Sequence, residues 1–470
     1  MSSDETKTSE SASCTQKDLE AFNAAFDKDA KNELAMNVVT QIDLNKASLS
    51  RKARLTHDHV YSVSIPDEAK PVTAQHSTGR CWLFAALNVM RIPFMKEHKL
   101  SEFQFSQSYL YFWDHFERCN FFLEQILDTL KEPLDGRLVQ YLLSKPIEDG
   151  GQFDMIVNIV EKYGVVPRDV FPEVEVTKSS RLLNRIIAHK LREFAMTLRS
   201  EHDKNKCDMD KLREIKKEQL KEVWRLMVIC FGKPPQQIRW AFRNKDKEHQ
   251  VLEAESPLDF YNKYVRKFVD VSEQISLVND PRNEYYKLYT VQRLNNIING
   301  ARPHVLYINV PVDVMKKYAI QRLSDGHPVW FGCDVGKHFY SDDGVMDLNN
   351  FDYQLLLGMD LKTMTKADRL RYGESLMTHA MVFTAVDLDK DKKPIKWRVE
   401  NSWSDSRGHK GYCLMTDAWF DEYNYQLVIP KSVLKEDKQI LAVLDQKPIE
   451  LPPWDPMGSL ANISEFDCKL

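Results

Sequence analysis

The stretch QHSTGRCWLFAALNVMR, from Gln75 to Arg91, decides the fold. In it a cysteine stands between a glycine-containing turn and a nearly unbroken apolar run. Such a run predicts a helix over residues 81–92 that is apolar on all sides, ends at Pro93 and lies deep in a core. Cys81 then falls in the first helical turn, where unpaired backbone N–H groups favour a negatively charged sulfur.

Cys81 has two interpretations at this point. Free cysteines are among the most buried residues, so its side chain could simply fill space in the core. A nucleophile instead needs surroundings that favour the thiolate. The capping and turn residues Ser77, Thr78 and Gly79 are expected to supply them by starting the helix just before the cysteine. Only residues elsewhere in the chain can decide between the two.

Three further residues favour a nucleophile. Gln75 lies six residues upstream, where its amide and the Cys81 N–H would donate hydrogen bonds to a developing oxyanion. His379 opens an apolar strand in MTHAMVFTAV, and Asn401 ends the next strand in VENSW. A histidine at such a position is most often a satisfied core residue, but an amide from the neighbouring strand would hold its ring in one orientation.

Bulk properties exclude several classes of protein. With 470 residues the chain has room for two or three domains, and its net charge of −4 provides no global attraction to nucleic acid. No stretch is apolar for long enough to cross a membrane, and the polar N-terminus is unlike a secretory signal, so a cytoplasmic location without a membrane partner is expected. Eight scattered cysteines form no CxxC pair, and we predict neither a metal nor a cofactor.

The residue pattern changes from helical to strand-like along the chain, which is typical of an α+β fold. Helical spacing runs over 19–60, 105–131 and 153–163, and strands are expected over 304–310, 327–335, 379–388, 395–403 and 411–420. We predict five segments: a disordered tail (1–18), an N-terminal arm and helical catalytic subdomain with Cys81 (19–174), a helical insertion (175–300), a strand-rich catalytic subdomain with His379 and Asn401 (301–461), and a C-terminal extension (462–470).

Taken together, these residues resemble the papain-like cysteine peptidases. The match consists of a glutamine six residues before the cysteine, Gly-x-Cys-Trp at Gly79–Trp82, the late His379, and Asn-Ser-Trp at Asn401–Trp403. The resemblance implies a papain-like two-subdomain fold. In that fold a helix carrying the cysteine faces a strand-built subdomain carrying the histidine and asparagine.

The sequence departs from that family at two points. Thr78 stands where the family signature has a disulfide-forming cysteine, which fits a protein that stays in a reducing compartment. Cys81 and His379 are 298 residues apart (379 − 81), against a usual separation of about 130 to 150. Roughly 150 extra residues therefore lie between them, which is consistent with the helical insertion predicted over 175–300.

Further segments narrow the resemblance to the bleomycin hydrolase family of cytosolic papain-like aminopeptidases. They are STGRCWLFAALNVMR, EDGGQFDMIVNIVEKYGVVP, VWFGCDVGKHF, YGESLMTHAM, KWRVENSW, GHKGY and LPPWDPMGSLA, spread over residues 77–461. That family implies a homohexameric ring, peptide and related amide substrates, and a C-terminal segment that lies in each cleft.

For the catalytic site, the resemblance implies that Cys81 attacks the scissile carbonyl and that His379 accepts and returns the proton. Asn401 orients the imidazole, and Trp403 shields that hydrogen bond from water. Gln75 and the Cys81 N–H hold the oxyanion.

Gly150 and Gly151 precede a predicted helix and, taken alone, are a turn signal. In papain-like enzymes the matching glycines let a substrate backbone approach closely, and the residue matching Phe153 borders a specificity pocket. We carry these substrate-binding roles over. Cys333 and His338 are interpreted as structural.

The C-terminus also departs from the family. Relatives end near WDPMGSLA, but nine more residues follow here. The extension is expected to be redirected, to be trimmed by the enzyme's own site, or to alter exopeptidase specificity. Its ending, Cys468-Lys469-Leu470, resembles the small-basic-Leu peroxisomal address, which gives peroxisomal import as an alternative location.

Two other functions remain as alternatives, a scaffold protein on an inactive papain-like fold and a nucleic-acid-binding protein. A scaffold needs none of the chemically competent residues. Basic clusters at 212–221 and 390–396 lack interleaved aromatic residues and are typical of solvated surface. Nucleic acid is therefore kept only as a secondary partner.

Overall fold

The structure, a computed structural model, describes residues 12–459. Most of the tail predicted over 1–18 lies outside the described residues, as does the extension 462–470 with its Cys468-Lys469-Leu470 ending. The predicted bound of the tail at residue 18 is wrong, because helix α1 already begins at Gln16.

The described chain forms two compact units. One consists of residues 12–57 and Leu348–Met364, and the other of Asp58–Asp347 and residues 365–459. Every residue predicted for the catalytic site belongs to the second unit.

Short helices build the first unit. Their bounds are α1 Gln16–Phe26, α2 Ala30–Val39, α3 Leu44–Ser48, α4 Arg51–Arg54 and α14 Tyr353–Leu357. The helical spacing of 19–60 is divided because Thr15, Asp29, Asp43 and Ser50 each accept a hydrogen bond from a backbone N–H of the helix that follows. Leu49 and Phe351 form an isolated bridge between the two segments of the unit.

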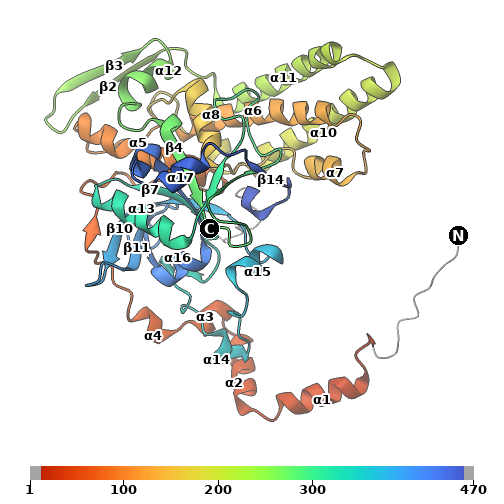
Figure 1. Cartoon of the computed structure of the whole chain (residues 1–470), viewed down its shortest axis with the longest axis vertical. Coiled ribbons are helices and arrows are strands. Elements are labelled where there is room, and N and C mark those ends of the chain that lie inside the picture. Colours follow the sequence, from red (N-terminus) through yellow and green to blue (C-terminus); the bar gives the residue numbers. More distant parts are fainter. Residues whose placement is uncertain (1–11, 460–470) are drawn as a thin grey trace. The chain divides into compact units, whose positions relative to one another are not determined.

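A mixed sheet lies within the second unit (Figure 1). Its strands follow the order β14, β5, β6, β4, β13, β7, β10, β11, β12, β9 and β8, and β1 pairs with β10 off this path. The bounds are β1 Val63–Ser64, β4 Gln274–Val278, β5 Lys287–Val291, β6 Tyr307–Asn309, β7 Val329–Cys333, β8 Phe339–Tyr340, β9 Val345–Met346, β10 His379–Leu388, β11 Pro394–Glu400, β12 Tyr412–Thr416, β13 Asn424–Pro430 and β14 Ile449–Leu451. The strand predicted over 379–388 is confirmed as β10, which pairs antiparallel with β7 and β11.

Helix α5 packs against β10, and the long helices α10 and α11 pack against α6 (Figure 1). The helix bounds are α5 Cys81–Glu97, α6 Gln107–Asp128, α7 Arg137–Ser144, α8 Phe153–Tyr163, α9 Glu175–Lys178, α10 Arg181–Asn205, α11 Met209–Phe231, α12 Pro257–Phe260, α13 Val312–Ser324, α15 Lys366–Arg371, α16 Asp417–Tyr423 and α17 Lys438–Val443. Helices α6 and α8 confirm the predictions over 105–131 and 153–163. Within residues 12–459, no helix combines the length and the apolar composition that a membrane crossing requires.

The prediction that this helix ends at Pro93 is wrong, because α5 continues to Glu97. A proline removes one backbone hydrogen bond from the interior of a helix. Phe94 is fully buried, with its ring 4.7 Å from that of Phe103 and 5.1 Å from that of Phe105. Packing of the last turn offsets the lost bond, so tertiary burial decides where this helix ends.

The prediction of a helical insertion over 175–300 is partly wrong, because the segment also contains strands. Helices α10 and α11 end at Phe231, and the hairpin of β2 (Ile238–Arg243) and β3 (His249–Ala254) follows before β4 and β5 join the main sheet. Strand β2 places buried Ile238 and Trp240 on alternate positions, which is the period of a strand. A smaller error concerns 417–420, predicted as strand, where Thr416 instead caps helix α16.

Candidate functional site

One pocket of the second unit, here called the Cys81 pocket, brings together residues from distant parts of the chain. Cys81 is the first residue of α5, and His379 is the first residue of β10. Both line the pocket, together with Gly151, Gln152 and Ser459. Residues nearly 300 positions apart in the sequence therefore share one cavity.

The Cys81 thiol lies at the start of α5, as predicted, and its side chain is only 2% exposed. Burial raises the pKa of this thiol to about 12, while hydrogen bonds from the backbone N–H groups of Ala380, Trp82 and Cys81 act in the opposite direction. Those N–H groups would stabilise a thiolate as soon as it forms.

The predicted helix caps are wrong. Arg80 is the N-cap residue of α5, and no side chain caps the helix. The Thr78 hydroxyl instead donates to the Gln75 carbonyl at 2.6 Å and closes the loop that precedes the helix. The first N–H groups of α5 thus receive no side-chain acceptor from this loop.

A hydrogen bond of 3.0 Å joins His379 Nε2 to Asn401 Oδ1. The Ser402 backbone N–H also donates to Asn401 Oδ1, at 2.8 Å, so this atom of the amide must be the oxygen. His379 Nε2 therefore carries the hydrogen of that bond, and Nδ1 is the nitrogen that can take up a proton. The Trp403 ring lies 5.1 Å from the imidazole.

Burial also lowers the pKa of His379 to about 4, and the hydrogen bond to Asn401 partly opposes this shift. A lone charge on either Cys81 or His379 is thus disfavoured in the pocket. Proton transfer from the thiol to the imidazole creates two opposite charges together, which attract each other strongly in a poorly solvated site.

Gln75 is buried beside the Cys81 loop but is not among the residues that line the Cys81 pocket. Its Oε1 accepts from the Ser402 hydroxyl at 2.6 Å, and its Nε2 donates to the Thr78 carbonyl at 2.5 Å. An amide nitrogen carries two hydrogens, so one N–H remains for a further acceptor.

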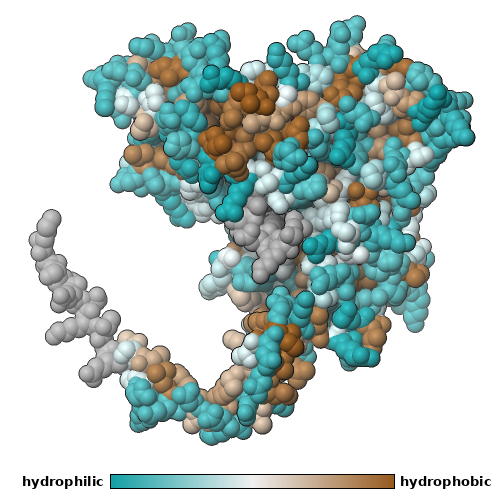
Figure 2. All heavy atoms as spheres, turned by 180° about the vertical axis from the view of Figure 1, so that it is seen from behind, coloured by the Kyte–Doolittle hydropathy of each residue, from teal (hydrophilic) through white to brown (hydrophobic). Residues whose placement is uncertain are grey.

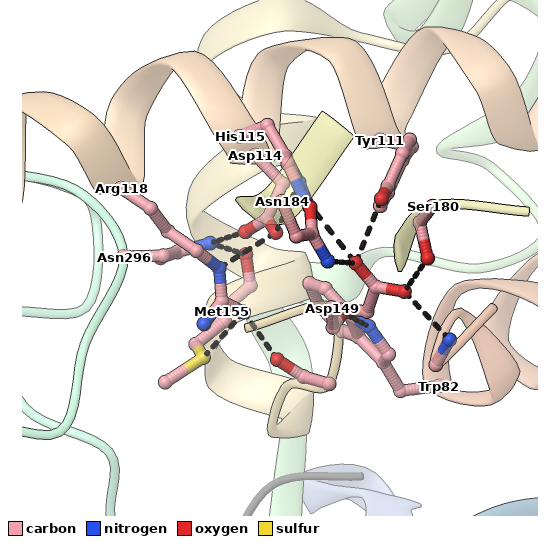
Figure 3. Close-up of polar contacts among 12 residues, drawn as sticks. Trp82, Tyr111, Asp114, His115, Arg118, Asp149, Met155, Ser180, Asn184 and Asn296 are labelled. Carbon is pink, nitrogen blue, oxygen red and sulfur yellow. Dashed lines mark hydrogen bonds and ion pairs between the residues drawn. The ribbon is translucent and has the colours of Figure 1, made fainter. Parts of the chain in front are cut away.

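A fully buried carboxylate, Asp149, lies behind this loop (Figure 3). Its hydrogen-bond donors are the Gly79 N–H (2.8 Å), the Ser180 hydroxyl (2.5 Å), the Tyr111 hydroxyl (2.7 Å) and the Asn184 amide (2.5 Å). Burial alone would raise the pKa of this carboxyl, but His115, Asn184 and Ser180 hold it well below its ordinary value. The charged Asp149 thus ties the Cys81 loop to helices α6 and α10.

A second ionic cluster holds the adjacent Gly150 peptide (Figure 3). Arg118 donates to the Gly150 carbonyl at 2.6 Å and to Asp114 at 2.7 Å. The Asn296 amide donates to the other oxygen of Asp114 at 2.9 Å. The peptide that precedes Gly151 is therefore fixed from behind.

Gly151 must be glycine because of packing inside the protein. A Cβ at this position would lie 2.7 Å from atoms of the Trp82 indole. Trp82 in turn donates its Nε1–H to the Asp149 carbonyl at 2.8 Å. Phe153 is buried at the start of α8, with its ring 5.6 Å from that of Trp330, which lines the Cys81 pocket.

The C-terminal segment, residues 449–459, is held along the second unit and reaches the Cys81 pocket. Strand β14 pairs with β5, and Arg282 donates to Asp455 at 2.9 Å. The Arg137 guanidinium lies 3.7 Å from the centre of the Trp454 ring. At the end of the segment, the Gln152 amide donates to the Ser459 carbonyl at 3.0 Å.

Four residues around the Cys81 pocket were not predicted as site residues: Asp149, Arg118, Gln152 and Ser459. Asp149 and Gln152 flank the glycine pair in EDGGQ, which was interpreted only as a turn. A charged residue beside a glycine pair is common in solvated turns, so this signal could not identify a buried carboxylate. Arg118 carries no sequence signal, whereas Ser459 lies in the segment LPPWDPMGSLA, which the family resemblance already placed in the cleft without singling out a residue.

Comparisons with known proteins agree over nearly the whole chain. The peptidase C1-like family matches residues 13–458. Human bleomycin hydrolase is 49% identical over 445 residues, which cover 93% of this chain and 96% of that protein. Aminopeptidase C of Lactococcus lactis subsp. lactis is 42% identical over 438 residues, which cover 93% of this chain and 97% of that protein.

A solved structure, that of PepW from Lactobacillus rhamnosis HN001, matches with a TM-score of 0.92 at 39% identity. The match covers 96% of this chain and 100% of that one. The alternatives of a scaffold or a nucleic-acid-binding protein find no support among these relatives.

Proposed function

Since the chain belongs to the peptidase C1-like family and is a cysteine aminopeptidase with the expected papain-like α+β fold, we propose that Cys81, His379 and Asn401 carry out its chemistry. The observation that carries the proposal is the bond between Asn401 and His379. It leaves Nδ1 of the imidazole as the base, in the same pocket as the Cys81 thiol.

In the proposed reaction, His379 takes the proton of the Cys81 thiol, and the sulfur attacks the carbonyl carbon of the scissile amide. The C–N bond then breaks as the imidazolium returns the proton to the leaving amine, which leaves a thioester on Cys81. Water, deprotonated by His379, hydrolyses this thioester and restores the thiol. Asn401 holds the ring throughout, and Trp403 shields the bond between them.

For the oxyanion we propose the Cys81 N–H and the remaining N–H of Gln75. Gln75 is well anchored for this role, because Ser402 and Thr78 hold its amide from two sides. Removing one donor of an oxyanion hole typically lowers turnover by about 10²- to 10³-fold.

Peptides and related amides are the proposed substrates. Gly150 and Gly151 would bind the substrate backbone, and Phe153 would border a specificity pocket behind Trp330. Within the second unit, we also keep the predicted division into a helical subdomain with Cys81 and a strand-rich subdomain with His379 and Asn401 as the two walls of the cleft. The C-terminal segment supports exopeptidase specificity, because Ser459 already lies in the Cys81 pocket.

We further propose that the protein forms a homohexamer. Support comes from apolar side chains exposed on the first unit (brown spheres in Figure 2). They include Leu19, Phe22, Phe26, Leu34, Met36, Leu355 and Met359. Exposed apolar side chains gathered on several helices of one unit are typical of surfaces buried by a partner.

For location we propose the cytoplasm, with peroxisomal import through Cys468-Lys469-Leu470 as the alternative. A fluorescent protein carrying the native C-terminus would give a diffuse signal in the first case and a punctate one in the second. Nucleic acid stays a secondary partner, and steep loss of binding with salt would be its minimum requirement.

The decisive experiment compares three forms: the intact protein, Cys81→Ala, and a form that ends at Ala461. Each is assayed on peptides with free and with blocked N-termini. We expect the intact protein to cleave only free N-termini and Cys81→Ala to be inactive. If Cys81→Ala keeps its activity, the mechanism is wrong, and efficient cleavage of blocked peptides by the intact form would contradict an exopeptidase site.

A further inference from the structure

Gln152 lies between Gly151 and helix α8. It lines the Cys81 pocket and is only 2% exposed. Its Nε2 donates to the Ser459 carbonyl at 3.0 Å. Because a carbonyl can only accept, this bond identifies the nitrogen of the amide, and Oε1 is the other atom. The Met155 N–H donates to the backbone carbonyl of Gln152 at 3.0 Å and not to its side chain. Gln152 Oε1 has no hydrogen-bond donor among residues 12–459.

A buried acceptor without a donor is costly. Several amide oxygens of the described residues lack a donor, among them Gln219 Oε1, but of these residues it is Gln152 that lines the Cys81 pocket. Because Gln152 shares a pocket with the reactive thiol, the unpaired oxygen points to a ligand group that donates hydrogen bonds. Among the described residues that line the Cys81 pocket, none carries a carboxylate. Gln152 Oε1 is thus an unused side-chain acceptor for a donor bound next to Cys81.

The substrate of an aminopeptidase carries such a donor at a fixed distance. Its α-ammonium is separated from the attacked carbonyl carbon by the N–Cα and Cα–C bonds, which places the two atoms about 2.5 Å apart. That carbon must come within about 3 to 3.5 Å of the Cys81 sulfur. Any residue that binds the α-ammonium must therefore line the pocket of the nucleophile.

We propose that Gln152 Oε1 accepts a hydrogen bond from the α-ammonium group of the substrate and so selects free N-termini. The inference rests on the proposed role of Cys81 and adds a specificity-determining residue to that site. The same side chain also holds the Ser459 carbonyl, so it would bind the substrate amine on one side and the C-terminal segment on the other.

The test uses two coumarin amides, one of alanine and one of propionic acid, which differ only by the amine. Gln152→Met keeps the length of the side chain and removes its acceptor. We expect kcat/KM to fall by about 10- to 10²-fold on the alanine amide, the usual effect of losing a hydrogen bond to a charged group, and to stay unchanged on the propionyl amide.

Gln219→Met is the matched control. Gln219, on α11, is also buried, donates to the Phe194 carbonyl at 3.4 Å and has an unpaired Oε1, but it does not line the Cys81 pocket. This variant should leave the ratio of the two rates unchanged. Gln152→Glu separates the two bonds of Gln152, because it keeps an acceptor oxygen and loses the donor to Ser459; it should retain the preference for the amine.

Equal loss on both substrates in Gln152→Met would overturn the proposal, since it would indicate a role limited to the C-terminal segment. An unchanged rate on the alanine amide would also overturn it. If propionyl turnover is too slow to measure, the inhibition constants of alaninal and propanal give the same comparison. Activity that survives Cys81→Ala would instead refute the nucleophile, which is a separate result.

Discussion

At the scale of single residues, the Asn401 amide fixes which nitrogen of His379 acts as a base. The Ser402 N–H is the decisive contact, because it can only donate and so assigns the oxygen of the amide. The ring of His379 is itself buried, and burial lowers its pKa from 6.5 to about 4. This buried neutral ring links the site to the stability of the fold.

We predict that His379→Gln makes the protein less sensitive to acid. Between pH 6.5 and about 4 the unfolded histidine is protonated while the folded one is not, so the wild-type free energy of unfolding falls as the pH falls through this window. The loss attributable to His379 is on the order of 3 kcal/mol across the whole window. Urea unfolding at a series of pH values measures it.

Glutamine does not titrate, so the wild-type curve should fall more steeply than the variant curve as the pH falls from 6.5 to about 4. Curves that stay parallel from pH 7 to pH 4 would show that His379 does not titrate in this window. The comparison with the variant is essential, because other buried groups titrate in the same range and contribute equally to both proteins.

At the scale of elements, the acid Asp149 connects the loop before α5 with α6 and α10. The Asp149 carboxylate accepts from the Gly79 N–H, which links it directly to the Cys81 loop. A second link is the hydrogen bond from Trp82 to the backbone carbonyl of Asp149. Thr78 stands in the same loop, where secreted relatives have a disulfide-forming cysteine. In this chain hydrogen bonds to a buried carboxylate restrain the loop.

We predict that Asp149→Asn lowers kcat by up to about 10²-fold, because the loop loses an acceptor and the oxyanion donors shift. The charge of Asp149 also raises the pKa of Cys81, so its removal should not slow alkylation of the thiol by iodoacetamide. Slower turnover without slower alkylation is the expected signature.

Asp154→Asn provides the control for this variant. Asp154 is an equally buried acid on α8 that accepts from the Leu306 N–H at 2.8 Å and has no bond to the Cys81 loop. Turnover should be retained in the control. A normal kcat in Asp149→Asn would show that the loop does not need the carboxylate.

At the scale of the whole molecule, the first unit exposes apolar side chains that do not contribute to a core of its own. Phe22 is 60% exposed and Leu34 is 65% exposed. A monomer with such helices would be prone to associate, and closed symmetric assembly is the usual way to bury them.

We predict that the double variant Phe22→Glu, Leu34→Glu disrupts the proposed hexamer and leaves the melting temperature of the second unit unchanged. Exposed side chains add little to the stability of a monomer, whereas charges in an interface are costly. Analytical ultracentrifugation checks the outcome. The control is Ile229→Glu on α11, which introduces a negative charge at a position that is 74% exposed. A wild-type protein that sediments as a monomer would refute the hexamer.

The sequence by itself determined the elements that periodicity encodes, including the start of α5 at Cys81 and the bounds of β10, along with the family resemblance that its motifs carry. Local pattern could not decide the end of α5 or the strands β2 to β5, because burial of Phe94 and pairing within sheets depend on distant partners. The motifs also predicted that Asn401 orients His379, but only the tertiary structure identified the atoms of that bond, enclosed Asp149 between α6 and α10, and brought Gln152 to Ser459. Each of these contacts links segments far apart in the chain, so it exists only once the helices and strands have packed.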